Sequence, residues 1–396
     1  MMHVALSASV IQRGRSGVGS YVFGLLDGLR AIDPALELTV LGFEDDRSLF
    51  EPWLDRFRWH PVQEYWRPAL RNIVWHHTVL PGILRALRAD VLHIPSYRRI
   101  VWNPPVPQVV TIHDCAAFAV RGKYDAARMF YGRHVVRRLA RQADLATTVS
   151  QATAADVAQY FGLQDLRVIW NGINHNLFKP LPQDQISARL AASFSQENPY
   201  FLYLARLEHP GKNHLRLIEA FERFATENPG RNVDLLLGGA DWHGAEIIHA
   251  RIAESPMRHR IRSLGFVGNE DLPVLYGGAT AMVYPSLFEG FGLPPIEAMA
   301  CGCPVICSPN GSLGEVVGDA ARLIDPEDIT SISAGLAAAP VTPEDRLKWA
   351  RRGIDHAAQF HWNHAARAMM ECYRAAVARN PIGGTARALL NPFAQR

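Results

Sequence analysis

The sequence lacks several features that mark particular classes of protein. No apolar run approaches the roughly 18 to 20 residues that span a bilayer, and the N-terminal segment is too short for a signal-peptide core, so a cytoplasmic protein is expected. The net charge of +3 is too small to indicate a nucleic-acid partner. Of only five cysteines, Cys301, Cys303 and Cys307 lie close together. No histidine cluster accompanies them and their spacing fits no zinc motif, so structural thiols are expected.

The length and the pattern of apolar segments indicate two α/β domains. A chain of 396 residues exceeds what one hydrophobic core usually serves, and 48% apolar with 20% charged residues is a globular composition. Apolar segments alternate with helical stretches, which favours parallel sheets covered on both faces. The predicted strands are Val4–Ala8, Leu38–Gly42, Val91–Ile94, Val109–His113, Leu145–Val149, Arg167–Trp170, Tyr200–Leu204, Val233–Leu237, Ile261–Val267, Ala281–Tyr284, Pro304–Cys307 and Ala321–Ile324.

These two blocks of strands predict two Rossmann-like parallel-sheet domains facing a cleft. We place the first domain at residues 1–175 and the second at residues 176–359, with the polar stretch 180–185 as the linker. Ligands of open parallel sheets bind at the carboxyl ends of the strands, so the cleft is the expected active site.

The most informative segment is 285–297, which runs from an apolar strand through a glycine-bearing loop into a short helix. Pro294 and Pro295 suit the first helical turn and cannot donate hydrogen bonds. The free amides at this helix start are therefore those of Gly290, Phe291, Gly292 and Leu293. Such amides favour a phosphate, and Glu289 and Glu297 can accept hydrogen bonds from hydroxyls, which together describe a nucleotide-sugar. An ordinary turn with two solvated acids is the alternative.

The whole string from Tyr284 to Ser308 is more specific than the two acids. Glu289 and Glu297 flank Gly290-Phe-Gly-Leu, and Ala298-Met-Ala-Cys-Gly-Cys-Pro-Val-Ile follows. This string resembles the signature of the family-four retaining glycosyltransferases of the GT-B fold (glycosyl transferases group 1). The resemblance covers about residues 1–375. It implies that the first domain lies on the acceptor side and is completed by a C-terminal helix at about 360–396, where Trp362 anchors the packing. The second domain would bind the nucleotide-sugar.

Arg206 and Lys212 lie in one short loop after the strand that ends at Ala205. A guanidinium binds phosphate through paired hydrogen bonds, and an ammonium adds a mobile point charge. The family carries an arginine and a lysine in this loop that hold the donor diphosphate. Their separation here is one residue wider than the family's commoner spacing, so the reach of Lys212 stays open. Two exposed surface cations are the alternative.

Two further candidates follow strands of the first domain. Gly17 and Gly19 open a helix, where glycines permit close approach of the backbone and the helix start favours anions, although a plain tight turn is as compatible. The resemblance implies a glycine loop over the donor phosphates here. It also places His113 against the transferred sugar, with a satisfied core histidine as the alternative. Adjacent strand residues point to opposite faces, so His113 and Asp114 should not form a dyad.

The resemblance also implies a division of roles. Arg206 and Lys212 would stabilise the charge that grows on the leaving diphosphate, Glu289 would hold hydroxyls of the transferred sugar, and Glu297 would take the ribose hydroxyls. The backbone of the segment 264–268, which includes Val267, would contact the nucleobase. The cations neutralise the leaving group and no Asp-x-Asp element is placed to bind an ion, so we expect no metal and no cofactor.

Residues 121–142 carry seven Lys or Arg and a single acid, Asp125. Arg133, Arg137 and Arg141 share one helical face. A solvated basic helix is one interpretation. The other is attraction to anionic lipid headgroups or to a pyrophosphate-linked acceptor, which would allow a peripheral position on the inner face of the plasma membrane.

We therefore predict a retaining, metal-independent glycosyltransferase. It would move a hexose of the mannose, glucose or N-acetylhexosamine type from a nucleotide diphosphate sugar to a saccharide or lipid-linked acceptor, in the synthesis of a cell-envelope polysaccharide or glycolipid. Two alternatives stay open. A nucleotide-sugar 2-epimerase of the same fold would consume donor with no acceptor present, and a catalytically inactive partner subunit would bind nucleotide without turnover.

Overall fold

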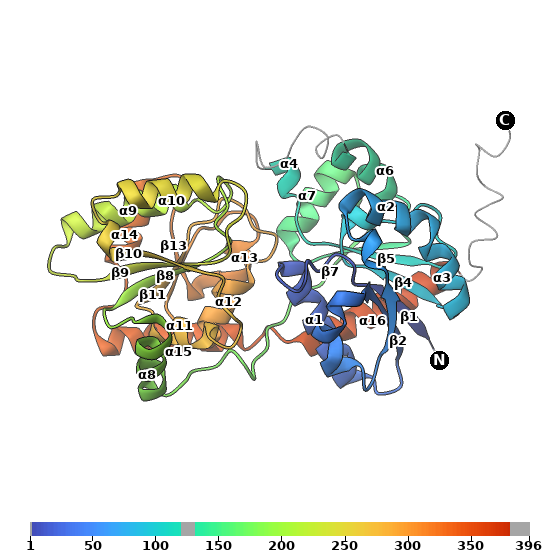
Figure 1. Cartoon of the computed structure of the whole chain (residues 1–396), viewed down its shortest axis with the longest axis horizontal. Helices are drawn as coiled ribbons and strands as arrows, with labels where there is room; N and C mark the ends of the chain where they lie inside the picture. The colour runs from blue at the N-terminus through green and yellow to red at the C-terminus, as the bar shows by residue number, and fades with distance from the viewer. Residues whose placement is uncertain (1, 120–130, 381–396) are drawn as a thin grey trace. The chain divides into compact units, whose positions relative to one another are not determined.

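The computed structural model describes residues 2–119 and 131–380. This part of the chain folds into two compact units (Figure 1). Unit 1 comprises residues 2–118, 131–172 and 361–380, and unit 2 comprises residues 119 and 173–360. Unit 1 is therefore discontinuous in the sequence, because its last helix follows the whole of unit 2.

Unit 1 is a parallel sheet of seven strands in the order β3-β2-β1-β4-β5-β6-β7. The strands are β1 (His3–Ser7), β2 (Glu37–Phe43), β3 (Arg58–Val62), β4 (Val91–Ile94), β5 (Gln108–Ile112), β6 (Leu145–Thr148) and β7 (Leu166–Val168). The helices are α1 (Gly17–Ile32), η1 (Glu44–Trp53), η2 (Glu64–Trp66), α2 (Ala69–Thr78), α3 (Leu80–Leu87), η3 (Tyr97–Arg99), α4 (Ala116–Ala119), η4 (Tyr131–Val136), α6 (Arg137–Ala140), α7 (Gln151–Phe161) and α16 (Trp362–Arg379).

Two cores cover the two faces of this sheet, since side chains alternate along each strand. Val4 and Leu6 of β1 join the core formed with α1 and α16, whereas Ala5 joins the core formed with α2, α3 and α7 (Figure 1). Trp362 of α16 is buried against α1, where a Cβ at Gly24 would lie 1.9 Å from its ring. Helix α16 can therefore close on α1 only because residue 24 has no side chain.

Unit 2 is a parallel sheet of six strands in the order β10-β9-β8-β11-β12-β13. The strands are β8 (Tyr200–Leu204), β9 (Asp234–Gly238), β10 (Ile261–Gly265), β11 (Ala281–Tyr284), β12 (Val305–Cys307) and β13 (Arg322–Leu323). The helices are α8 (Gln183–Phe194), α9 (His214–Glu227), α10 (Ala245–Glu254), η5 (Arg258–Arg260), α11 (Leu272–Gly278), α12 (Leu293–Ala300), α13 (Leu313–Val317), η6 (Gly318–Ala320), α14 (Ile329–Ala337) and α15 (Pro343–Ala357). Helices α9, α10 and α14 cover one face, and α8, α11 and α15 cover the other (Figure 1).

The predicted α/β fold with two Rossmann-like parallel sheets is confirmed, and every predicted strand overlaps an observed one. Strand β3 was not predicted. It pairs only with β2 at the sheet edge, and it contains Pro61, which has no N–H to donate. The predicted linker 180–185 lies within unit 2, and its last three residues belong to α8, which begins at Gln183.

The five cysteines are buried and none forms a disulfide bond, which agrees with the predicted structural role of their thiols. Residues 121–130 of the basic segment lie outside the described residues. Within the segment's described part, the Nε of Arg141 donates to the carbonyl of Phe161 at 2.8 Å, so this arginine supports α7. Across residues 2–119 and 131–380, none of the helices combines the length and the apolar character needed to cross a membrane.

Candidate functional site

The candidate site in unit 2 lies where the strand order reverses. Strands β9 and β10 lie on one side of β8 in the sheet, and β11, β12 and β13 lie on its other side. Open parallel sheets bind ligands outside the carboxyl ends of the strands at such a reversal. Arg206 and Lys212 follow β8, and Glu289 follows β11, so these three residues share this edge of the sheet.

Lys212 follows β8 and Glu289 follows β11, and their side chains are in contact at the point where the strand order reverses. The Nζ of Lys212 lies 2.5 Å from Oε1 of Glu289, and each side chain is 14% exposed. Hydrogen bonds between the two loops bring them together, because the N–H of Leu287 donates to the carbonyl of Gly211 at 3.0 Å and the side-chain amide of Asn213 donates to that of Pro285 at 3.0 Å. Despite the wider spacing of its loop, Lys212 reaches the acidic motif.

Further contacts fix Glu289. The hydroxyl of Tyr284 donates to Oε1 at 3.0 Å, and burial together with this carboxylate raises the pKa of Tyr284 well above its usual value. The backbone N–H and the hydroxyl of Ser312 both donate to the Glu289 carbonyl at 3.1 Å. Gly311 has φ +64°, and a Cβ there would lie 2.4 Å from the same carbonyl oxygen. The loop therefore holds Glu289 from both its side chain and its backbone.

Arg206 has two partners in unit 2. Its Nη2 donates to Oε2 of Glu208 at 3.1 Å, and its guanidinium carbon lies 4.8 Å from the centroid of the Trp242 ring. Glu208 is buried, whereas Trp242 is half exposed. The cation is thus oriented within a polar and aromatic setting and does not extend freely into solvent.

The start of α12 carries backbone amides that have no acceptor in the described part of the chain. Among the described residues, no acceptor takes the amide hydrogens of Phe291, Gly292 or Leu293. Gly292 has φ +91°, which favours glycine and turns the chain into the helix. Gly290, Phe291 and Gly292 are all buried. Three amides therefore remain to bind an anion at this edge of the sheet.

Glu297 lies one turn further along α12. The hydroxyl of Tyr276 donates to its Oε2 at 3.1 Å, and burial raises the pKa of Glu297 to about 7. The carboxyl is therefore partly protonated near neutral pH. Val267, half-buried after β10, lies beside the end of β9, where a Cβ at Gly238 would lie 3.3 Å from its Cγ2.

The remaining candidates lie in unit 1. The Nε2 of His113 lies 3.0 Å from the Pro95 carbonyl, which can only accept, so Nε2 carries the hydrogen and Nδ1 is left as an acceptor. Burial lowers the pKa of His113 to about 4, so the ring is neutral at pH 7. Gly19 lies in the first turn of α1, but its N–H donates to the N-cap hydroxyl of Ser16 at 3.1 Å. Gly17 is exposed, with open space on the side where a side chain would project. The ligand roles of these three residues stay predictions.

Four residues of the site were not predicted, namely Glu208, Trp242, Tyr276 and Tyr284. Tyr276 and Tyr284 read as core positions of a helix and a strand, and only their hydroxyl contacts reveal them. Trp242 follows β9 in a loop with no motif. Glu208 gave a weak signal, as an acid two residues after an arginine. In the described part of the chain, no group of three or more His, Cys, Asp or Glu is arranged to hold a metal ion.

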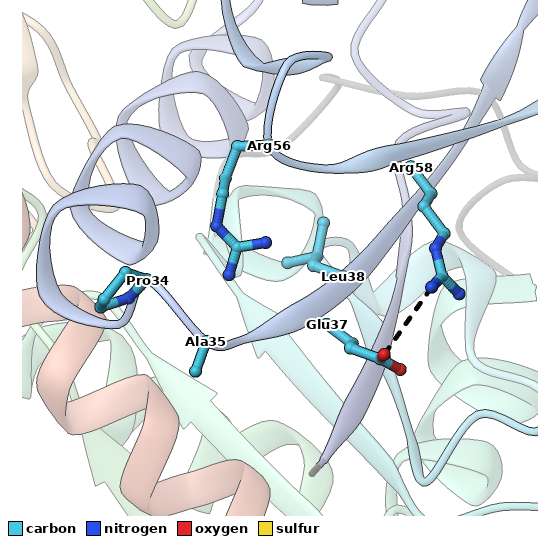
Figure 2. Close-up of a pocket in the computed structure, with 6 residues that line it drawn as sticks. All are labelled: Pro34, Ala35, Glu37, Leu38, Arg56 and Arg58. Carbon is cyan, nitrogen blue, oxygen red and sulfur yellow. Dashed lines mark ion pairs between the residues drawn. The ribbon is translucent and has the colours of Figure 1, made fainter.

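A separate cavity lies in unit 1, beside the amino-terminal ends of β2 and β3 (Figure 2). An ion pair of 3.7 Å between Glu37 and Arg58 crosses part of its wall. The lining residues are Pro34, Ala35, Glu37, Leu38, Arg56 and Arg58. It therefore lies at the edge of the sheet opposite the carboxyl ends and is separate from the candidate residues.

Two family models match the chain, one over each block of strands. Glycosyltransferase Family 4 matches residues 15–177, and Glycosyl transferases group 1 matches residues 185–356. O-antigen chain mannosyltransferase B of Escherichia coli is 31% identical over 67% of this chain and 70% of its own length. MMP alpha-(1->4)-mannosyltransferase of Mycolicibacterium hassiacum is 31% identical over 64% of this chain and 59% of its own length. The crystal structure of HepE of Anabaena in complex with UDP and glucose matches 94% of this chain and 100% of its own, with a TM-score of 0.75 at 18% identity.

Proposed function

Since the chain belongs to the family-four glycosyltransferases of the GT-B fold, we propose that it transfers a hexose from a nucleotide diphosphate sugar to a saccharide or lipid-linked acceptor, with retention at the anomeric carbon. The two mannosyltransferase relatives favour a mannose-type sugar. A product in a cell-envelope polysaccharide or glycolipid agrees with the O-antigen relative. The structural neighbour with UDP and glucose supports a nucleotide-sugar as the donor class.

The contact between Lys212 and Glu289 carries this proposal. It brings a cation from the loop after β8 and a carboxylate from the loop after β11 together at the strand reversal. A nucleotide diphosphate sugar offers the matching chemistry, because its phosphates need cations and its hydroxyls need acceptors. In the complex with the donor, the Lys212 ammonium would donate hydrogen bonds to the diphosphate as well as to Glu289. Glu289 would accept hydrogen bonds from hydroxyls of the sugar.

The proposed catalysis is electrostatic. When the bond between the anomeric carbon and the phosphate oxygen breaks, the electron pair leaves with the diphosphate. Arg206, Lys212 and the amides of residues 291–293 stabilise that charge, so the proposed mechanism uses no metal ion. The acceptor hydroxyl attacks from the face that the diphosphate leaves, and its proton passes to a departing phosphate oxygen.

For unit 1 we propose two supporting roles. Nδ1 of neutral His113 accepts a hydrogen bond from a hydroxyl of the transferred sugar, and the loop at Gly17 and Gly19 contacts the donor phosphates. The basic segment 121–142 would bring the enzyme to anionic lipid, where a lipid-linked acceptor resides.

Thermal-shift measurements with GDP-, UDP- and ADP-sugars test the donor class, because a ligand that binds only the folded protein raises its Tm. We expect one nucleotide series to raise the Tm, and release of that nucleotide diphosphate to require an acceptor.

Lys212→Gln should reduce turnover about tenfold or more, as expected for loss of a charge-assisted phosphate contact. No shift with any of the three series, or full turnover in Lys212→Gln, would contradict the proposal. Donor consumption without an acceptor would instead indicate an epimerase.

A further inference from the structure

Two segments run side by side beyond the regular ends of β8 and β9. The N–H of Leu207 donates to the carbonyl of Ala240, and the N–H of Trp242 donates back to the carbonyl of Leu207, both at 3.0 Å. Leu207 and Asp241 form a parallel bridge. The pairing of the two strands therefore continues past their ends and fixes the backbone of the segments that carry Arg206 and Trp242.

Gly239 permits this close approach. Its φ is +151°, and a Cβ at this position would lie 2.0 Å from the carbonyl oxygen of Ala205. Its N–H donates to the carbonyl of Gly265 at 2.7 Å, which ties the segment to the end of β10 as well. A side chain at residue 239 would push the segment carrying Trp242 away from the one carrying Arg206.

The result is a guanidinium held on two sides. Glu208, 5% exposed, accepts from Nη2 of Arg206 at 3.1 Å and fixes one edge of the group. The indole of Trp242 covers the guanidinium at 4.8 Å from the ring centroid. An ion pair alone lets the group rotate about the bonded nitrogen, but stacking on an aromatic ring also restricts the plane of the guanidinium.

We propose that Trp242 is a positioning residue for glycosyl transfer, which stacks on Arg206 and thereby directs the remaining N–H donors of the guanidinium to the diphosphate of the donor. The inference rests on the proposed function, in which Arg206 binds that diphosphate. Trp242 acts through Arg206 and needs no contact with the ligand.

Because the Trp242 side chain is exposed, its positioning role can be tested separately from a role in the stability of the fold. The side chain is 50% exposed, so it contributes little to the core of unit 2. Trp242→Ala should therefore keep the Tm within about 2 °C of the wild type. Ile247, 45% exposed on the neighbouring α10, provides a matched control, and Ile247→Ala should change neither the Tm nor the activity.

A double-mutant cycle on the full-length protein tests the proposal, with kcat/KM measured for the donor nucleotide-sugar. Trp242→Ala should lower kcat/KM about three- to tenfold, the size expected from loss of a partly exposed cation–π contact. Trp242→Phe should recover most of the loss, because phenylalanine also offers an aromatic face. In an Arg206→Gln background, which lacks the guanidinium, Trp242→Ala should cause no further loss.

Equal losses from Trp242→Ala in the wild-type and Arg206→Gln backgrounds would overturn the positioning role and leave the phosphate-binding role of Arg206 intact. Failure of Trp242→Phe to recover activity would also overturn it. Full activity in Arg206→Gln alone would contradict the proposed role of Arg206, and the role of Trp242 with it.

Discussion

At the scale of single residues, the raised pKa of Glu297 makes the stability of the fold sensitive to pH. Burial is the main cause, and the folded-state pKa of about 7 lies above the ordinary value of 4.5. A carboxyl whose pKa is raised by folding is protonated more in the folded than in the unfolded state between these values. Its contribution to stability is therefore full below pH 4.5 and falls as pH rises through 7, by an amount on the order of 3 kcal/mol.

We predict that nucleotide binding by Glu297 has the opposite dependence. In the proposed complex, ribose hydroxyls would donate to the ionised carboxylate, so the Kd of the bound nucleotide should fall as pH rises from 6 to 8, by up to about tenfold from this group. Calorimetric titration at both pH values measures the effect. Glu297→Gln is the control, since it keeps any pH dependence that belongs to the nucleotide phosphates. An unchanged pH dependence in this variant would contradict the role of Glu297.

Arg206 gives a second prediction at this scale. Glu208 is buried, and Arg206→Ala removes a partner that is itself 36% exposed. We expect a stability loss of only about 1–2 kcal/mol, because solvent already screens the pair. Adding Glu208→Gln to the Arg206→Ala variant should recover part of the lost Tm and none of the lost activity. Recovery of both would mean that Arg206 serves the fold and not the ligand.

At the scale of secondary-structure elements, variants at two glycines distinguish a loop that contacts the ligand from a loop that is needed for packing. Gly17 begins α1 with open space around it, so Gly17→Ala should keep or slightly raise the Tm while lowering activity if the loop contacts phosphate. Gly311→Ala places a Cβ against the Glu289 carbonyl and should lower both. Parallel melting and activity assays of the two variants check this. Full activity in Gly17→Ala would remove that loop from the phosphate site.

The elements also show what could be predicted from the sequence. Buried parallel strands such as β8 and β11 are continuous apolar runs, so their ends, and the loops with Arg206 and Glu289, could be located in advance. Edge strand β3 could not, because pairing on one side tolerates exposed Arg58 and Pro61. Trp242 was missed because its contact with Arg206 joins the loops that follow β9 and β8, and no local spacing encodes that contact. Tyr284 was missed because it reads as a core position of β11, and only the contact of its hydroxyl with Glu289 reveals its role.

At the scale of the whole molecule, the two units differ in continuity. Unit 2 is formed almost entirely by residues 173–360, whereas unit 1 needs α16 from the far end of the described chain. The core between the sheet and α1 includes Trp362, Met369 and Tyr373 of α16. Without that helix, a large apolar face of unit 1 would be open to water, at about 25 cal/mol for each Å² exposed.

We therefore predict different behaviour for the separate pieces. A fragment of residues 173–360 should fold cooperatively and bind the nucleotide diphosphate that stabilises the full chain, because Arg206, Lys212, Glu289 and Glu297 all lie within it. A fragment of residues 1–172 should aggregate or stay partly unfolded, and a peptide of residues 361–380 should restore its structure. Circular dichroism and calorimetric titration of both fragments measure this. A stable fragment 1–172 would show that α16 is dispensable, and a folded fragment 173–360 without nucleotide affinity would mean that the nucleotide site needs residues outside unit 2.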